Sequence, residues 1–160
     1  MKQIYGNQSD DRLPVIVDSR EQRPYFTSHQ YDTKIAKVVK GLKSGDYSLA
    51  DYEDKIAIER KSLADLFGSL TRHRKRFERE IQRLQDYEFS AVVVEASLPQ
   101  ILHPMQYCPG WRSKASPKAI IQTILTWMVR YPKTHWVFGH DRPSSEAVVL
   151  NLLRHFWNGK

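Results

Sequence analysis

The apolar residues of the chain form short strand-like runs separated by longer stretches with helical spacing. Short apolar runs that end at acids or turn residues predict buried strands at residues 14–18 and 89–95, and residues 135–138 follow the same pattern. Residues 35–42 fit a further strand less clearly. The polar segment at the start, residues 1–13, is expected to be flexible.

A polar turn at residues 51–54 joins two strand-like segments, and this pattern predicts an antiparallel hairpin. Alternate side chains of a strand leave opposite faces, so Glu59 and Lys61 share one face while Arg60 lies on the other. If the hairpin folds symmetrically about its turn, Asp46 lies opposite Glu59. Asp46, Glu59 and Lys61 would then meet on one patch.

Helical spacing is clearest over residues 69–87, where an apolar stripe contains Leu70, Phe77, Ile81 and Leu84. A second helix is predicted from Ser116-Pro117 to about Tyr131, where a proline follows. Ser144 or Ser145 is expected to cap a final helix whose apolar residues point almost all round. Such a helix is either sandwiched in the core or part of a subunit interface.

The long proline-containing segment 98–117 is predicted to be a loop with at most a helical turn. It carries Tyr107, Trp111, Arg112 and Lys114. Interleaved aromatic and basic residues fit contact with single-stranded or branched DNA. An aromatic latch packed on the core explains the aromatic residues equally well.

Charge points to an anionic partner. The chain of 160 residues has 25 Lys and Arg against 18 Asp and Glu, a net charge of +7, and nucleic acid is the commonest partner of such proteins. The single Cys108 excludes an internal disulfide, and the six His lack zinc-type spacing. No apolar run approaches membrane-spanning length. We expect an intracellular protein, cytoplasmic or nucleoid-associated, with no membrane contact.

A line of arginines within residues 69–87 lies away from the apolar stripe, and it comprises Arg72, Arg76, Arg79 and Arg83. Arginines at helical spacing suit a row of phosphates. The alternative is a solvated face balanced by Glu78 and Glu80. His73, Arg74 and Lys75 are weaker candidates for the same contact.

Other acids stand at the ends of predicted elements. Asp18 ends a buried strand, Glu21 follows it, and Glu95 ends another strand, so each is either a site acid or an ordinary turn or cap residue. Asp65 stands three residues after Ser62 in a capping-box arrangement, and it can support the start of the following helix or orient Lys61 or Arg60.

Three ordered elements resemble the nuclease domain of the XPF family of structure-specific endonucleases, within the PD-(D/E)xK fold. The elements are Val17-Asp18-Ser19-Arg20-Glu21, Gly45-Asp46-Tyr47 and Glu59-Arg60-Lys61-Ser62-Leu63-Ala64-Asp65. The resemblance implies an α/β fold with a restriction-endonuclease-like mixed central sheet flanked by helices. It covers about residues 14–157, and we expect one nuclease domain over 14–160 without a helix-hairpin-helix or helicase domain.

The same resemblance implies roles for the matching residues. Asp46 and Glu59 would be ligands of Mg²⁺, for which Mn²⁺ is a usual substitute, and Asp18 a further ligand or a holder of bound water. Lys61 would orient the attacking water. The supporting residues would be Glu21, Arg20, Arg60 and Asp65. Arg72, Arg76, Arg79, Arg83, Lys75, Arg112 and Lys114 are the candidate DNA contacts.

The expected activity is therefore metal-dependent hydrolysis of DNA phosphodiester bonds, with a preference for branched DNA such as flaps, forks or junctions, in repair or recombination. Family nuclease domains associate through helices near their end, so a homodimer through the C-terminal helices is expected. Two alternatives remain: a Holliday-junction resolvase or restriction-type nuclease of the same fold, and a non-catalytic DNA-binding scaffold subunit.

Overall fold

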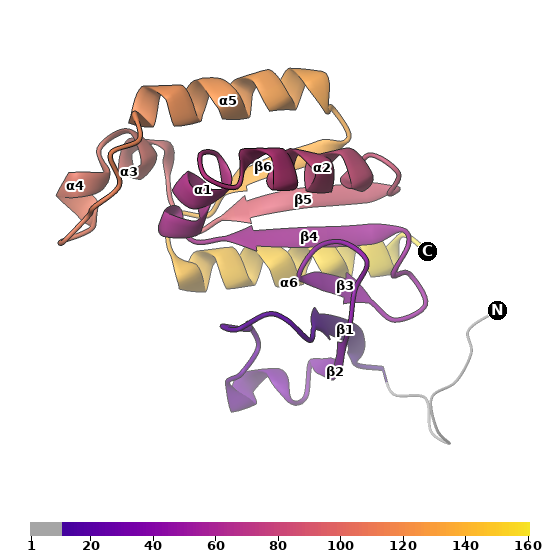
Figure 1. Ribbon diagram of the computed structural model, residues 1–160. Helices are drawn as coiled ribbons and strands as arrows, with labels where there is room; N and C mark the ends of the chain where they lie inside the picture. The colour runs from indigo at the N-terminus through magenta and orange to yellow at the C-terminus, as the bar shows by residue number, and fades with distance from the viewer. Residues whose placement is uncertain (1–10) are drawn as a thin grey trace.

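A six-stranded mixed sheet forms the centre of the computed structural model, which describes residues 11–160 (Figure 1). The strands follow the order β2-β1-β3-β4-β5-β6. β3 pairs antiparallel with β1 and with β4, while the other pairings are parallel. This architecture confirms the expected α/β fold with a mixed central sheet. The bounds are β1 Leu13–Asp18, β2 Ile35–Lys40, β3 Tyr47–Leu49, β4 Ile56–Lys61, β5 Phe89–Val94 and β6 Thr134–Phe138.

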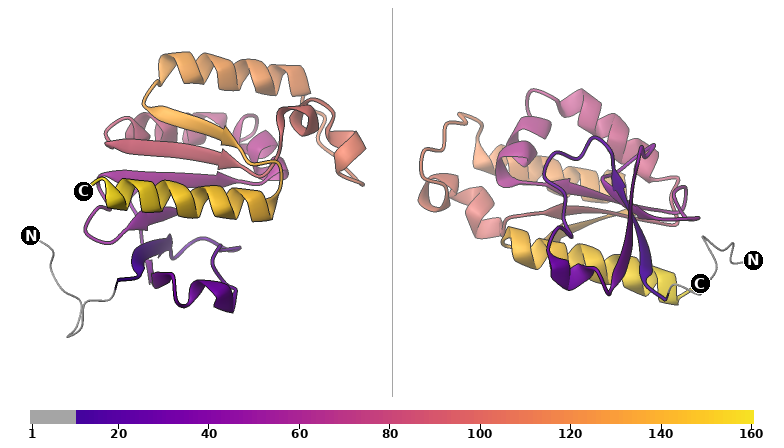
Figure 2. Two further views of the ribbon diagram at one scale, coloured as in Figure 1. Left: turned by 180° about the vertical axis from the view of Figure 1, so that it is seen from behind. Right: turned by 90° about the horizontal axis from the view of Figure 1, so that it is seen from below.

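Helices cover both faces of the sheet (Figures 1 and 2). One apolar cluster joins α1, α2 and α5 to side chains such as Ala57, Val92 and Trp136. The other joins α6 to the opposite face, where Ile58 and Val93 point. The helices are η1 His29–Tyr31, α1 Leu63–Ser69, α2 Arg74–Leu84, α3 Leu98–Leu102, α4 Pro104–Tyr107, α5 Pro117–Arg130 and α6 Arg142–Asn158.

The predicted hairpin and its register are confirmed. Tyr47 of β3 pairs with Ile58 of β4, and the backbone N–H of Asp46 donates to the Ile58 carbonyl at 2.8 Å. Asp46 therefore lies opposite Glu59. Gly45 makes this approach possible, because its φ is +77° and a Cβ there would lie 3.1 Å from the Ile58 carbonyl oxygen.

The helix predicted over residues 69–87 is shorter in the structure. Ser69 is the last residue of α1, and α2 begins only at Arg74 and ends at Leu84. A turn separates the two helices, and in it the Thr71 hydroxyl donates to the Phe67 carbonyl. The apolar stripe remains valid because Phe77, Ile81 and Leu84 are buried in α2 and Leu70 is buried just before it.

The segment 98–117 contains two short helices, α3 and α4, where at most one turn was expected. Ser97 begins α3 with a capping box, because its hydroxyl accepts from the Gln100 N–H while the Gln100 side chain accepts from the Ser97 N–H. The sequence contained this Ser-x-x-Gln signal. The prolines at 99 and 104 stand in the first turns of α3 and α4, where proline is tolerated.

The final helix packs against the sheet, which confirms the first of its two interpretations, a helix sandwiched in the core. Val149 and Leu153 are fully buried there, and α6 begins at Arg142 with Asp141 as its cap, in place of Ser144 or Ser145. The Ser145 side chain faces inward and is buried.

At the N-terminus, residues 1–10 of the predicted flexible segment lie outside the described residues, and β1 begins at Leu13. Over residues 11–160, no helix is both long and apolar enough to cross a membrane.

Candidate active site

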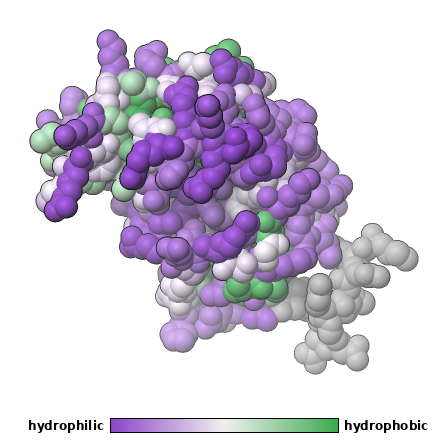
Figure 3. All heavy atoms as spheres, in the orientation of Figure 1, coloured by the Kyte–Doolittle hydropathy of each residue, from purple (hydrophilic) through white to green (hydrophobic). Residues whose placement is uncertain are grey.

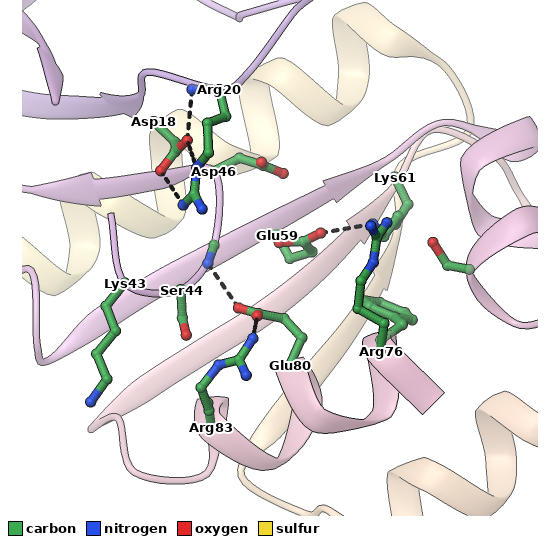
Figure 4. Close-up of a pocket in the computed structure, with 13 residues that line it drawn as sticks. Asp18, Arg20, Lys43, Ser44, Asp46, Glu59, Lys61, Arg76, Glu80 and Arg83 are labelled. Carbon is green, nitrogen blue, oxygen red and sulfur yellow. Dashed lines mark hydrogen bonds and ion pairs between the residues drawn. The ribbon is translucent and has the colours of Figure 1, made fainter. Parts of the chain in front are cut away.

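A cleft of about 320 Å³ opens between the Asp46 turn, β4 and α2 (Figure 4). Asp18, Asp46, Glu59 and Lys61 line it together, so the predicted acids and lysine share one cavity wall. A second cleft on the other side of Asp46, Glu59 and Lys61 is lined by the remaining motif residues, namely Glu21, Arg60 and Asp65. The three sequence elements therefore converge at one end of the sheet.

Asp46 is fixed by hydrogen bonds of both its backbone and its side chain. Its carbonyl accepts from the Asp18 N–H at 2.8 Å, and its N–H donates to the Ile58 carbonyl at 2.8 Å. Its Oδ2 accepts from the backbone N–H of Arg60, also at 2.8 Å. These bonds connect β1 to β4 and leave the other carboxylate oxygen for the cleft.

Glu59 and Lys61 form an ion pair on the face of β4 that carries Ala57. Lys61 Nζ lies 2.7 Å from Glu59 Oε1, and both side chains are largely buried. Burial opposes the charge on Lys61, but the Glu59 carboxylate outweighs it, and the pKa of Lys61 is raised above its ordinary value. Lys61 also lies over the Phe77 ring at 4.5 Å. The ammonium is therefore charged at neutral pH and held in place.

Burial raises the pKa of the Asp46 carboxyl well above its ordinary value, and repulsion from Glu59 raises it further. The Arg60 N–H opposes this shift and does not cancel it. Two carboxylates that repel one another across a shared cleft gain stability from any cation that binds between them.

The donor set fits a hard divalent cation such as Mg²⁺ or Mn²⁺, because Asp46 and Glu59 offer carboxylate oxygens to the same cleft. This donor set contains two carboxylates rather than three. Among residues 11–160, no group of three or more His, Cys, Asp and Glu side chains is arranged to hold a metal ion. Asp46 and Glu59 are therefore the two side chains that could hold such a cation.

Asp18 lines the cleft, but its carboxylate is fully engaged. Arg20 donates to it from its backbone N–H, Nε and Nη2 at 2.8 to 2.9 Å, and the Leu42 N–H donates at 2.7 Å. Burial alone would raise the pKa of Asp18, but these hydrogen bonds outweigh it and lower the pKa. In this arrangement the Asp18 carboxylate holds Arg20 and the Leu42 N–H, and its predicted role as a further metal ligand stays a prediction.

Arg60 points to the opposite face, as its strand position predicted. Its guanidinium donates to both oxygens of Glu95 at 2.7 and 3.0 Å and lies 3.6 Å from Glu21. Glu95 also accepts from Tyr25 and Arg142. Glu95 thus completes a buried ionic network behind the cleft and is not part of the cleft lining.

Asp65 has the predicted capping role. Its N–H donates to the Ser62 hydroxyl at 3.1 Å, and that hydroxyl donates to the Asp65 carboxylate at 2.6 Å. The carboxylate lines the second cleft and favours the charged form of Lys61 from a distance. Its predicted role in orienting Lys61 stays a hypothesis.

The predicted arginines do not all lie on one helix. Arg76, Arg79 and Arg83 are on α2, whereas Arg72 lies in the turn before it. Arg76 and Arg83 line the cleft, and Arg76 extends from α2 toward the Glu59–Lys61 pair (Figure 4). Arg79, Arg72 and Lys75 are exposed. Arg74 instead packs over Trp127 and donates to Thr123.

In the 98–117 segment, the aromatic residue nearest the basic pair is a latch on the core. Trp111 packs edge-to-face on Phe67 of α1 at 4.8 Å, which confirms for this residue the alternative of an aromatic latch packed on the core. Tyr107, Arg112 and Lys114 remain exposed.

Glu80 was missed as a site residue, although it stands on the arginine face of α2. It lines the cleft, its Oε1 accepts from the Gly45 N–H at 3.2 Å, and it pairs with Arg83. Sequence reasoning treated it as a charge-balancing acid. Because Gly45 is 35 residues away, only the tertiary packing of α2 on the Asp46 turn could reveal this contact. Lys43 and Ser44 of the same turn were also missed.

The comparisons with known proteins agree with this geometry. A family model described as the ERCC4 domain matches residues 17–152, which is most of the chain and includes the three motif elements. The chain belongs to the ERCC4 domain family. No match was found among curated proteins.

Among solved structures, the fold of this ERCC4 domain is similar to that of XPF from Aeropyrum pernix. One structure of that protein aligns with a TM-score of 0.67 and 24% sequence identity, over 92% of this chain and 64% of the other. A second, of the same protein in complex with DNA, aligns with a TM-score of 0.65 and 23% identity, over 92% and 66%. The likeness thus extends over about two thirds of those chains.

The pKa of Asp46 predicts how stability depends on pH. The Asp46 carboxyl binds its proton more tightly in the folded chain than in the unfolded chain. Ionising it therefore costs folding stability at any pH above its ordinary pKa of about 4. Asp46→Asn keeps an acceptor for the Arg60 N–H, so we expect it to be more stable than wild type at pH 7. The gain should disappear near pH 4 in urea melts with EDTA. Asp86→Asn, at an exposed position, is the control; an equal gain there would contradict the assignment.

The Glu80 contact predicts the behaviour of the Gly45 amide. Glu80→Ala removes its acceptor, so hydrogen exchange at this amide should accelerate, and unfolding free energy should fall by about 1 kcal/mol. Glu80→Gln retains an oxygen acceptor and should keep the amide protected. Residue-resolved exchange by NMR checks this, and equal acceleration in both variants would show that charge rather than the hydrogen bond holds the turn.

Proposed function

We propose that the chain is a metal-dependent DNA endonuclease that prefers branched DNA. The observation that carries the proposal is the Asp46–Glu59 pair, which shares a cleft with Lys61 and is bordered by Arg76 and Arg83. Membership of the ERCC4 domain family supports it. So does the similarity to XPF from Aeropyrum pernix, one structure of which is a complex with DNA.

In the proposed reaction, Asp46 and Glu59 would hold Mg²⁺ or Mn²⁺. When bound, such a cation supplies positive charge against the scissile phosphate and lowers the pKa of water. Lys61 orients the attacking water and stabilises the charge that develops on the pentavalent phosphorus oxygens. Its ammonium is pre-positioned by Glu59 at 2.7 Å, so little reorganisation accompanies the reaction.

The support for Asp46 comes from the buried Arg60. Its backbone N–H fixes the Asp46 carboxylate, while its side chain is clamped by Glu95 and Glu21 on the far side of the strand. Arg60 is therefore proposed as a positioning residue. Asp18 is proposed to hold Arg20 beside the cleft, where the guanidinium can attract a phosphate.

The DNA backbone is proposed to run along the exposed arginine side of α2. Arg76 and Arg79 have no ion-pair partner among the residues that the structure describes, and Lys75 and Arg72 extend this basic surface. The surface over this region is strongly hydrophilic in Figure 3. Arg112 and Lys114 add exposed basic groups after α4.

A homodimer through the C-terminal helices remains part of the proposal, but with α5 as the contact. The apolar residues of α6 pack within the chain, whereas Leu125, Met128 and Val129 of α5 are 49%, 39% and 83% exposed. An exposed helical stripe of this kind suits a second copy of the same surface. Sedimentation of Val129→Glu would test it, and an unchanged dimer would exclude this surface.

Cleavage assays test the proposed activity. Wild type should nick flap, fork or junction DNA with Mg²⁺, whereas Asp46→Asn and Glu59→Gln should lose about a hundredfold or more in rate with little loss of affinity. Asp86→Asn is the matched control, since it removes an exposed acid away from the cleft. Equal nicking by wild type and both cleft variants would exclude this site.

The positions of the cuts distinguish the proposed function from its alternatives. Paired symmetric nicks on a mobile junction would indicate a resolvase-like nuclease, and sequence-dependent cuts in plain duplex a restriction-type nuclease. Tight DNA binding with no cleavage under any divalent metal would indicate a scaffold subunit.

The α2 surface predicts a salt effect. Arg76→Ala with Arg79→Ala should weaken duplex binding and reduce the slope of log K against log salt by about two, one for each lost phosphate contact. Arg154→Ala on α6, across the sheet, should leave both unchanged. If the two substitutions leave affinity and slope unaltered, the DNA path does not follow α2.

A further inference from the structure

A protrusion made of α3, α4 and the segment up to Lys114 extends beyond the sheet (Figures 1 and 2). It leaves the carboxyl end of β5, whose Val94 pairs in parallel register with Lys61 of β4. The protrusion therefore begins at the same end of the sheet as the Glu59–Lys61 pair.

The tip of the protrusion is apolar and exposed. Met105 is 79% exposed, and Tyr107, Leu98 and Leu102 are 50%, 46% and 42% exposed. Green apolar spheres gather over this part of the surface in Figure 3. Four exposed large side chains within ten residues form a patch of the kind that marks an interaction site.

Basic residues follow this patch in the sequence, and its own segment contains no acid. Between Glu95 and Asp141 the sequence contains no Asp or Glu, while Arg112, Lys114 and Lys118 follow the tip. Arg112 and Lys114 are exposed, and neither has an ion-pair partner within residues 11–160. The surface therefore complements a ligand that is both apolar and anionic.

The protrusion is also anchored. The Trp111 ring packs on Phe67 of α1 at 4.8 Å, and the Trp111 backbone N–H donates to the Cys108 carbonyl at 3.1 Å. The Ser97–Gln100 capping box fixes the start of α3. Since α1 follows directly on Lys61 and Ser62, this anchor holds the tip in a defined position relative to the cleft.

We propose that the protrusion binds unpaired nucleotides of branched DNA, with Tyr107 stacking on a base, Met105 packing against a base face, and Arg112 and Lys114 contacting the adjacent phosphates. An unpaired strand offers apolar base faces beside phosphates, whereas a duplex buries its base faces and presents phosphates alone. The proposal rests on the proposed nuclease function and names the feature of the substrate that sets branch preference.

Binding of two DNA molecules tests it. We would compare a fork with single-stranded arms and a blunt duplex of equal length by fluorescence anisotropy, in EDTA so that no metal-dependent cleavage occurs. Met105→Ser with Tyr107→Ser should lower affinity for the fork about tenfold or more and leave duplex affinity nearly unchanged. Val39→Ser, which alters a 66% exposed valine on edge strand β2, should alter neither.

A 2-aminopurine base in the unpaired arm gives a second readout. Stacking on Tyr107 should quench its fluorescence in the wild-type complex, and the double variant should abolish the quenching. Equal loss on fork and duplex, or no loss on either, would overturn the proposal. So would loss of a dimer in sedimentation with DNA binding intact, which would make the patch a contact between copies.

The failure of this proposal is distinguishable from failure of the proposed function. If wild type binds and nicks the fork but the double variant behaves like wild type, only the protrusion proposal falls. If wild type neither binds nor nicks any DNA in the panel, the nuclease proposal falls with it. Unchanged circular dichroism and melting temperature would establish that the variants are folded.

Discussion

The geometry of the cleft depends on the hydrogen bonds that Asp46 makes with two other strands. Its carbonyl accepts from Asp18 at the end of β1, its N–H donates to Ile58 of β4, and its carboxylate accepts from the Arg60 N–H. This arrangement places one acid beside another and raises the pKa of Asp46. The resulting repulsion costs stability, and perturbed carboxyl groups of this kind are common at functional sites.

Because side chains alternate along a strand, β4 places the residues of the cleft on one face and the residue that positions them on the other. Glu59 and Lys61 face the cleft on one side, while Arg60 between them points to Glu95 and Glu21 on the other. The same residue also donates its backbone N–H to Asp46. A buried ion pair of this kind adds little net stability because of its desolvation cost, but removing one partner leaves an unpaired buried charge. The network therefore contributes mainly to the positioning of the strand end.

Sequence reasoning succeeded where local rules determine the structure. The hairpin register follows from strand alternation and the symmetry of a short turn, so Asp46, Glu59 and Lys61 were placed correctly without long-range information. It failed where tertiary packing decides. The break at Leu70–His73 interrupts a continuous helical pattern, and Glu80 meets Gly45 only because α2 packs over the Asp46 turn. The engagement of Asp18 by Arg20 and Leu42 likewise needed the fold.

The distribution of charge within the cleft explains why acids and bases occur there together. The four acids that line it, Asp18, Asp46, Glu59 and Glu80, are accompanied by five bases, Arg20, Lys43, Lys61, Arg76 and Arg83 (Figure 4). A site of carboxylates alone would repel a polyanion, and a site of bases alone would bind a phosphate without holding a cation. Asp18 and Glu80 are engaged by Arg20 and Arg83, and Glu59 is paired with Lys61. Asp46 accepts the Arg60 backbone N–H with one of its two carboxylate oxygens. In the proposed reaction the basic groups would attract the phosphate backbone, and Asp46 and Glu59 would repel it until a cation is bound. A bound cation and a phosphate would thus favour each other's binding in the proposed reaction, which is the electrostatic coupling that the proposed metal-dependent activity requires.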